Sequence, residues 1–207
     1  MLSQVRPALV MLALFSALTG LAYPLAITGI AQAVFPDQAN GSLIRVKDAV
    51  VGSSLIGQNF ASDKYFHPRP SATSAPDPKD PSKTIDAPYN AANSSASNFG
   101  PTSQKLIDRV KGDVDAKRQA GMTGPIPADA VTTSASGLDP HISPEYALAQ
   151  AEAVAKARGM SEEKVKALVK AHTEGRAFGL FGEPRVNVLL LNMALDGLSS
   201  SSDLSER

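Results

Sequence analysis

The residues best placed for chemistry lie in one short stretch, residues 52–59, which reads GSSLIGQN. Gly52 and Gly57 have the spacing of the two glycines in a phosphate-binding loop, whose backbone N–H groups cradle phosphates. Gln58 and Asn59 stand where such a loop carries Lys and Ser or Thr, so the cation that would meet the β- and γ-phosphates is missing. The pattern therefore favours a turn at the edge of a strand, with polar contacts from Gln58 and Asn59 to a nucleotide as the alternative.

Other kinds of catalytic or metal site find little support in the sequence. His67, His141 and His172 are isolated, and none is four residues from another, so no zinc site of the helical type is prepared. No serine stands in a Gly-x-Ser-x-Gly frame, and cysteine is absent, which excludes thiolate catalysis and disulfides. Residues 139–144 combine a rigid turn with a helix cap, and structure alone explains each residue type there.

Charge and length set further limits. Twenty Lys and Arg balance twenty Asp and Glu, so no summed field would draw nucleic acid to the protein. We therefore exclude nucleic acid as a partner. The chain has 207 residues, and the roughly 170 that follow the apolar N-terminal segment suit one compact core.

The N-terminal segment is apolar enough to cross a membrane. After a short tail of residues 1–6, residues 7–36 carry no charged side chain. As a helix this run would reach about 45 Å, against a hydrocarbon core of about 30 Å. Pro24 removes a backbone donor and crowds the carbonyl of Gly20, which predicts a bend or a loosening there. The sequence therefore predicts one transmembrane helix in contact with the lipid bilayer.

Small residues on this helix indicate helix docking. Ser16 and Gly20 are four residues apart, as are Ala22 and Ala26. Small residues at this spacing let a second helix come close in lipid, so we expect partner helices at these four positions. The alternative is that Ala and Gly are simply frequent in membrane helices.

A cleavable signal peptide is the rival interpretation of the same segment. Arg6 precedes the apolar run, and the triplet at residues 31–33, Ala-Gln-Ala, resembles a cleavage site. The triplet lies far beyond the most apolar block, whereas signal segments end near their cleavage site. We therefore expect the helix to be retained. The charge rule does not decide orientation, since Arg6 lies on one side and Arg45 and Lys47 on the other.

The remaining chain predicts one mixed α+β domain over residues 37–198, followed by a flexible tail at 199–207. Its expected strands are residues 42–46, 49–56 and 186–191, with a hairpin turn at 47–48. A long irregular loop is expected over 66–100, which is rich in proline and serine. Its expected helices run from about residue 100 to 121, from the N-cap Ser143 to Gly159, and from the N-cap Ser161 to Gly175.

Several uncommon strings, in this order behind a single membrane helix, resemble the C subunit of the Kdp potassium-transporting P-type ATPase. They are RP at 6–7, YPL at 23–25, VGSSLIGQNF at 51–60, YF at 65–66, RPSA at 69–72, SNFGPT at 97–102, SGLDPHISP at 136–144 and VNVLLLN at 186–192. The chain departs from the family at His67, where members often carry Trp, and in the loop at 74–87, which is longer and richer in proline and charge than is usual in the family.

The resemblance implies an accessory, non-catalytic subunit of an ATP-driven, high-affinity potassium uptake complex in the bacterial inner membrane. The implied partners are a channel-like potassium-binding subunit, an ATP-hydrolysing pump subunit and a small stabilising subunit. Potassium would be the transported ion. ATP would be held by the pump subunit, whose affinity for it this family is described as raising in the manner of a catalytic chaperone.

The same resemblance creates a conflict over ATP. It implies a single-pass subunit whose soluble domain lies outside, in the periplasm, whereas ATP is cytoplasmic. Direct contact of Gln58 or Asn59 with nucleotide would then be impossible, and we expect the domain to brace the channel-like subunit instead. The alternative from another class is a membrane-tethered extracytoplasmic binding protein, and an independent enzyme is the weakest choice.

Overall fold

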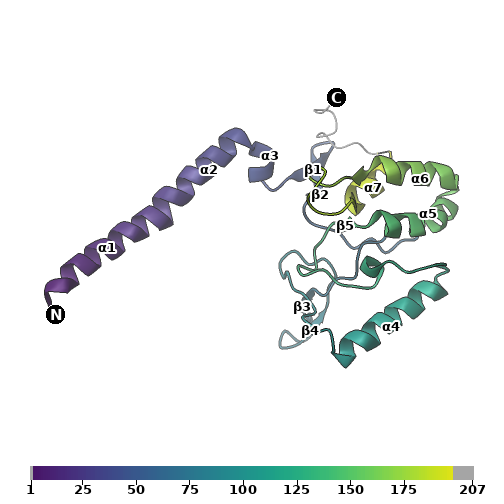
Figure 1. The fold of residues 1–207 in the computed structure, drawn as a ribbon, viewed down its shortest axis with the longest axis horizontal. Coiled ribbons are helices and arrows are strands. Elements are labelled where there is room, and N and C mark those ends of the chain that lie inside the picture. Colours follow the sequence, from purple (N-terminus) through teal and green to yellow (C-terminus); the bar gives the residue numbers. More distant parts are fainter. Residues whose placement is uncertain (1, 198–207) are drawn as a thin grey trace. The chain divides into compact units, whose positions relative to one another are not determined.

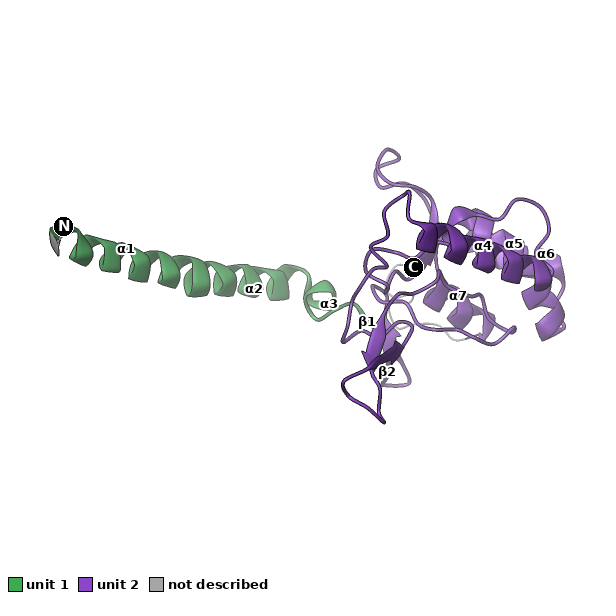
Figure 2. Ribbon diagram, turned by 90° about the horizontal axis from the view of Figure 1, so that it is seen from below, with its two compact units in different colours: residues 1–43 green, residues 44–207 purple. Residues whose placement is uncertain are grey.

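The computed structural model describes residues 2–197, so the predicted tail at 199–207 lies outside the described residues. The chain divides into two units, residues 1–43 and residues 44–207 (Figure 2).

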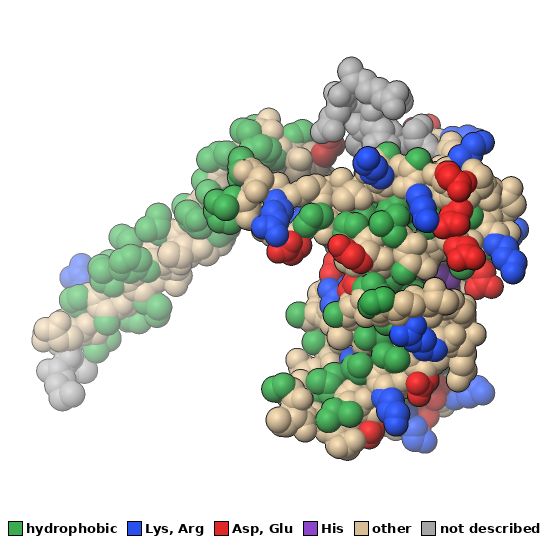
Figure 3. All heavy atoms as spheres, turned by 45° about the vertical axis from the view of Figure 1, so that its right-hand side comes forward, with side chains coloured by type: hydrophobic (Ala, Val, Ile, Leu, Met, Phe, Trp, Pro, Cys, Tyr) green, Lys and Arg blue, Asp and Glu red, His purple; other side chains and the backbone are tan. Residues whose placement is uncertain are grey.

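The first unit is one long apolar helix followed by a short one. Its elements are a 3-10 turn at Leu2–Gln4, α1 at Val5–Ala17, a π-helical turn at Leu18–Ala22, α2 at Tyr23–Val34 and α3 at Pro36–Ala39. Together Val5–Val34 form one helix that is long and apolar enough to span a membrane. Apolar side chains dominate its visible face in Figure 3.

The loosening predicted at Gly20 is confirmed by the π-helical turn. Pro24 has no backbone N–H to donate to the carbonyl four residues earlier, so the ladder widens just before it. The Thr19 hydroxyl donates a hydrogen bond to the carbonyl of Phe15, 2.7 Å away. The helix passes through the proline without ending.

The predicted hairpin after the membrane helix is present. β1 (Leu43–Val46) and β2 (Ala49–Ser53) form a two-stranded sheet. Lys47 and Asp48 connect them at φ values of 48° and 67°, the left-handed geometry of a tight hairpin turn. β2 ends at Ser53 instead of Ile56, because the backbone turns and Ile56 N–H donates back to the Ser53 carbonyl.

The irregular segment over 66–100 contains more structure than the sequence suggested. A short antiparallel hairpin forms within it from β3 (Ser74–Pro76) and β4 (Thr84–Asp86). Its first part is anchored in the domain, since Phe66 and Thr73 are almost fully buried. Hydrogen bonds from side chains satisfy backbone groups here that a neighbouring strand would otherwise satisfy.

Two of the three predicted helices end where their caps indicate. α4 spans Gln104–Gln119, so it begins about four residues later than predicted, and α5 spans Pro144–Arg158. Ser143 caps α5 by accepting a hydrogen bond from the Tyr146 N–H at 3.0 Å, and Gly159 ends it at φ 65°. The third helix, α6 (Glu162–Ala171), stops four residues before Gly175, so that prediction of its end was wrong. Thr173 and Glu174 form strand β6 instead.

The strand predicted over 186–191 is wrong beyond its first two residues. β7 covers only Arg185–Asn187, and α7 begins at once and runs over Val188–Leu195. Asn187 is the cause, because its side chain accepts a hydrogen bond from Leu190 N–H at 3.2 Å and caps the helix. A short apolar run cannot by itself distinguish a buried strand from a buried helix.

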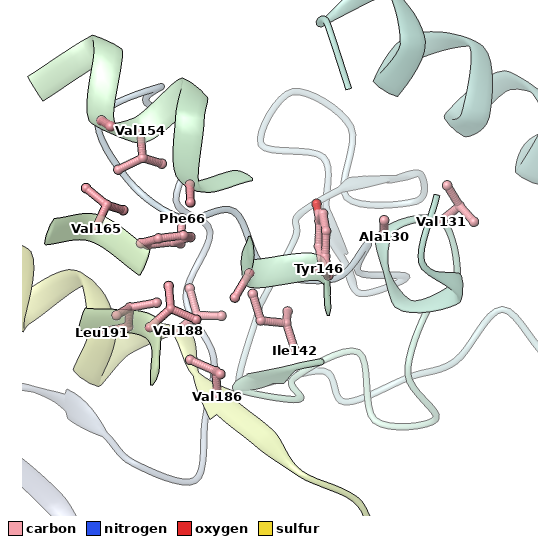
Figure 4. Packing of buried hydrophobic residues seen from close by; sticks show 14 residues of the cluster. Phe66, Ala130, Val131, Ile142, Tyr146, Val154, Val165, Val186, Val188 and Leu191 are labelled. Carbon is pink, nitrogen blue, oxygen red and sulfur yellow. The ribbon is translucent and has the colours of Figure 1, made fainter. Parts of the chain in front are cut away.

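The core lies between a small sheet and the C-terminal helices. β7 is the central strand of an antiparallel sheet in the order β5-β7-β6, where β5 is His141–Ile142. α5 and α6 lie side by side in Figure 1. Phe66 enters the core beside Val154 and Val165 (Figure 4). The irregular segment therefore contributes one of the largest buried side chains of the domain.

Candidate functional site

Five of the eight strings that carried the resemblance come together in the second unit. We call residues 51–60, 65–72, 136–144 and 186–192 the motif junction, because hydrogen bonds link these four segments. The Gly57 N–H donates to the Leu138 carbonyl at 2.8 Å, and the Asn187 amide donates to the Ser54 carbonyl at 2.8 Å. The junction joins parts of the chain that are more than a hundred residues apart in sequence.

An ion pair lies at the centre of the motif junction. Arg69 Nη1 lies 3.0 Å from Asp139 Oδ2, and both side chains are about a quarter exposed. Asp139 also accepts a hydrogen bond from the His141 N–H at 3.0 Å. Burial acts to raise the pKa of Asp139, but the hydrogen bonds from His141 and the charge of Arg69 outweigh it and hold the pKa below its ordinary value. Asp139 is therefore a structural anion at neutral pH.

Gly57 is required by close packing beside this pair. A Cβ at position 57 would collide with the ring of Tyr89 and come 2.9 Å from the Asp139 carbonyl oxygen. The Tyr89 hydroxyl donates to the Arg69 carbonyl at 3.0 Å, so the ring is held in place. Burial raises the pKa of Tyr89, which keeps this donor protonated. Close packing therefore explains why the second glycine of the apparent phosphate loop, Gly57, is a glycine, without any role in binding phosphate.

Gln58 and Asn59, the predicted nucleotide contacts, lie in different environments. Gln58 Nε2 donates to the Val51 carbonyl at 2.8 Å and holds its own loop together. Asn59 is exposed. The pocket beside Gln58 is lined mostly by apolar side chains such as Phe60 and Leu189 and has a volume of about 110 Å³. That volume is well below the roughly 300 Å³ at which ordinary ligand pockets begin. The geometry supports the turn interpretation of this stretch.

Two buried amides fasten the irregular segment to the helices. Asn192, which is 1% exposed, accepts from the Phe66 N–H at 2.8 Å and donates to the Phe66 carbonyl at 3.0 Å. Gln150 does the same for His67, at 2.8 and 3.2 Å. Each amide replaces the two hydrogen bonds that a neighbouring strand would otherwise supply.

Sequence reasoning missed these fastening residues. It did not single out Asn192, Gln150 or the Arg69–Asp139 pair, although three of the four lie inside or beside the quoted strings. A polar residue at a helix position that otherwise reads as apolar was the available signal for Asn192. The bonding partner of each residue could not be predicted from sequence spacing, because the two residues of each contact are between 70 and 126 positions apart.

His67 makes the stability of this part of the domain sensitive to acid. Burial, and secondarily the charge of Lys117, lowers the pKa of His67, while the charge of Asp63 opposes them. The unfolded chain therefore binds a proton at His67 more readily than the folded one. Above pH 6.5, the ordinary pKa, His67 is neutral in both states and does not reduce the free energy of unfolding. As the pH drops below that value, the free energy of unfolding falls.

His67→Trp, which installs the residue that the resemblance leads us to expect at this position, is expected to remove this part of the acid sensitivity. Thermal melting of the full chain in detergent between pH 7.5 and 5 provides the measurement. The variant's melting temperature should change less over this range than that of the original protein. Asn59→Trp, which adds the same side chain at an exposed position and removes no titratable group, serves as the control and should leave the pH dependence as it was. Equal slopes for all three proteins would contradict the assignment to His67.

The four predicted helix-docking residues are all exposed on the helix Val5–Val34. Gly20 lies in the π-helical turn, and a Cβ there would meet no atom within 4 Å. Ser16 and Ala22 are six residues apart, and at about 100° per residue the two small-residue pairs face different sides of the helix. The surface of the helix therefore offers two narrow faces instead of one.

Within residues 2–197 the structure brings together no group of three or more acidic or histidine side chains suited to a metal ion. The polar side chains of the motif junction bond mainly to backbone atoms and to one another. The arrangement holds an irregular chain in one conformation. It offers no nucleophile with an adjacent base among the contacts described above.

Comparisons with known proteins agree with this organisation. The family described as "KdpC: K+-transporting ATPase, c chain" matches residues 5–197. A "Potassium-transporting ATPase KdpC subunit" of Rhodopseudomonas palustris (strain BisB5) is 62% identical over 196 residues, covering 95% of this chain and 98% of the relative. The protein of the same name from Bradyrhizobium diazoefficiens is 62% identical and covers 95% of this chain and 98% of that relative. The one from Methylorubrum populi is 58% identical and covers 96% of this chain and 99% of that relative. The match takes in both the apolar helix and the motif junction, and the chain belongs to the KdpC family, the c chains of K+-transporting ATPases.

Proposed function

We propose that this chain is the accessory subunit that an uncleaved membrane helix holds within an ATP-driven, high-affinity potassium uptake complex. The helix Val5–Val34 carries the proposal: after Arg6 it has no charged side chain, none of its residues is buried, and Ser16, Gly20, Ala22 and Ala26 are exposed. An exposed apolar helix needs lipid or other helices around it. The partners are the channel-like potassium-binding subunit, the ATP-hydrolysing pump subunit and the small stabilising subunit.

The soluble domain lies on the extracytoplasmic side of the inner membrane and braces the channel-like subunit around its outer vestibule. It raises the affinity of the pump subunit for ATP indirectly, through the membrane subunits. The paired polar groups of the motif junction support an indirect effect, since Gln58 already bonds to Val51 within its own loop. The junction gives the domain the rigidity that a brace requires.

Protease protection tests the orientation. Membranes that contain the whole ATPase are prepared as right-side-out and as inverted vesicles, and each is treated with trypsin. We expect the domain to be cut in right-side-out vesicles and to be protected in inverted ones until detergent is added. Protection in the right-side-out vesicles, with cutting in the inverted ones, would place the domain in the cytoplasm and end this version of the function.

Asn59→Ala tests whether the apparent phosphate loop touches nucleotide. Asn59 is exposed, so the change should leave the fold intact. If ATP is affected only indirectly, the KM for ATP of potassium-stimulated ATPase activity in the purified complex should stay within about twofold of the original, a difference of about 0.4 kcal/mol. Asn93→Ala, at another exposed position, is the matched control. A tenfold rise in KM for Asn59→Ala alone would show direct contact with nucleotide.

A further inference from the structure

The loop between β6 and β7 carries three large apolar side chains into solvent. Phe178 is 98% exposed, Leu180 is 68% exposed and Phe181 is 65% exposed. We call these three residues the apolar tip. The six residues from 177 to 182, AFGLFG, include no polar side chain. Neither the motif junction nor the membrane helix accounts for such a surface.

The apolar tip stands on a firmly closed hairpin. Glu174 and Arg185 pair across β6 and β7, and their side chains form an ion pair at 2.9 Å. One step further out, Arg176 and Glu183 form a second ion pair at 2.7 Å. Beyond these pairs, Ala177 and Phe181 exchange two backbone hydrogen bonds, at 2.9 and 3.0 Å. The neighbouring residue of β7, Val186, is fully buried, so the hairpin is rooted in the core.

The backbone of the tip adopts a conformation that a bulky residue rarely takes. Phe178 has a φ of 54°, and Gly179 and Gly182 have φ values of 72° and 80°. Left-handed geometry is unfavourable for a phenylalanine, and strained backbone of this kind concentrates at binding sites. The hairpin thus holds an aromatic ring outward at a conformational cost, with no contact in the domain to offset it.

The size of the tip restricts what can cover it. Three side chains present far less than the roughly 800 Å² per partner that a stable, independent interface needs. A second copy or a freely diffusing protein would therefore not remain bound through this contact alone. The membrane helix changes the situation, because it keeps the domain beside whatever shares the bilayer with it and raises the effective concentration.

The construction of the hairpin favours a protein pocket over the lipid surface. Lipid insertion requires neither a fixed backbone nor a strained phenylalanine, whereas a preformed aromatic anchor ringed by polar groups is typical of a protein hot spot. We call the two ion pairs below the apolar tip the neck of the hairpin. Its arginines, Arg176 and Arg185, are already paired with glutamates, so the neck has no spare positive charge to attract anionic lipid.

Resting on the proposed function, we infer that the apolar tip inserts into an apolar pocket on another membrane subunit of the same K+-transporting ATPase. Phe178 fills the pocket, and Leu180 and Phe181 seal its edge. The rim of the pocket carries no excess charge, because the neck of the hairpin is neutral. The contact therefore depends little on salt concentration.

Photocrosslinking in membranes that contain the whole ATPase tests the inference. The photoreactive analogue p-benzoylphenylalanine replaces Phe178 in one sample and Ile85, exposed on β4, in the control. Illumination should yield an adduct from position 178 whose mass equals this chain plus one other subunit, at least tenfold more abundant than from position 85. An adduct with lipid alone, with a second copy of this chain, or no excess over position 85 would overturn the inference.

Phe178→Ser gives an independent readout. Phe178 makes no buried contact, so the variant should melt at the same temperature as the original chain. The fraction that stays with the other subunits during prolonged washing in mild detergent should fall about fivefold. If the original chain itself fails to co-purify, the proposed function fails. If the original chain co-purifies and Phe178→Ser does so equally well, only the inference about the tip fails.

Discussion

Gly20→Leu is expected to lower the fraction of this subunit that co-purifies with the other subunits about tenfold, which corresponds to about 1.4 kcal/mol of association free energy. The chain itself can accept the new side chain, since no atom lies within 4 Å of a Cβ at this position. The loss would therefore arise outside the chain, where the leucine prevents another helix from approaching the face formed by Ser16 and Gly20. Quantitative mass spectrometry of the detergent-extracted complex measures the ratio.

Leu14→Phe is the matched control for this experiment. Leu14 is exposed on the same helix, and at about 100° per residue it lies on the opposite side from Ser16, so added bulk there should leave the face formed by Ser16 and Gly20 open. Normal assembly and transport in Gly20→Leu would remove the support for helix docking at this face. It would also favour a simple membrane tether, as a self-standing binding protein would have.

The second large effect concerns the fold of the soluble domain. Asn192→Leu should lower the free energy of unfolding by about 3 kcal/mol, because the Phe66 N–H and carbonyl would both lose their partner in a buried position. For a domain of this size that loss corresponds to a fall in melting temperature of roughly 6 to 12 °C. Circular dichroism of the full chain in detergent provides the measurement.

Asn93→Leu makes the same chemical change at an exposed position. The Asn93 side chain also bonds to a backbone carbonyl, that of Ser74 at 3.0 Å, but water can replace that contact. Its effect should stay within about 0.5 kcal/mol. If the two variants melted at the same temperature, the buried amide of Asn192 would not be what fastens Phe66 to α7.

Local signals predicted the elements whose causes are local. The N-cap Ser143 and the stop at Gly159 fixed α5, and the loosening before Pro24 followed from the missing N–H of proline. The hairpin turn at Lys47 and Asp48 also followed from its position between two apolar runs. These features depend on residues within four or five positions of one another.

Features with distant causes could not be predicted. α6 ends early because Thr173 pairs with Val186 in the sheet. The start of α7 has a local cause, the Asn187 cap on the Leu190 N–H, but the continuous apolar run concealed it. The predicted loop over 66–100 is held by Asn192 and Gln150, whose side chains bond to a backbone 83 to 126 positions away. Nothing in the spacing of these amides identifies their partners. The family strings located the motif junction but gave no account of how its segments touch.

N-terminal sequencing combined with co-purification tests whether an uncleaved apolar helix keeps this subunit in the bilayer among the other subunits. The chain is produced from its native membranes with a C-terminal tag, extracted in mild detergent, and analysed for its first residue and its companions. We expect a chain that retains residues 5–34 and carries the other subunits of the K+-transporting ATPase with it in constant ratio. A mature chain that begins near Val34 and is recovered alone, without membrane, would contradict this expectation.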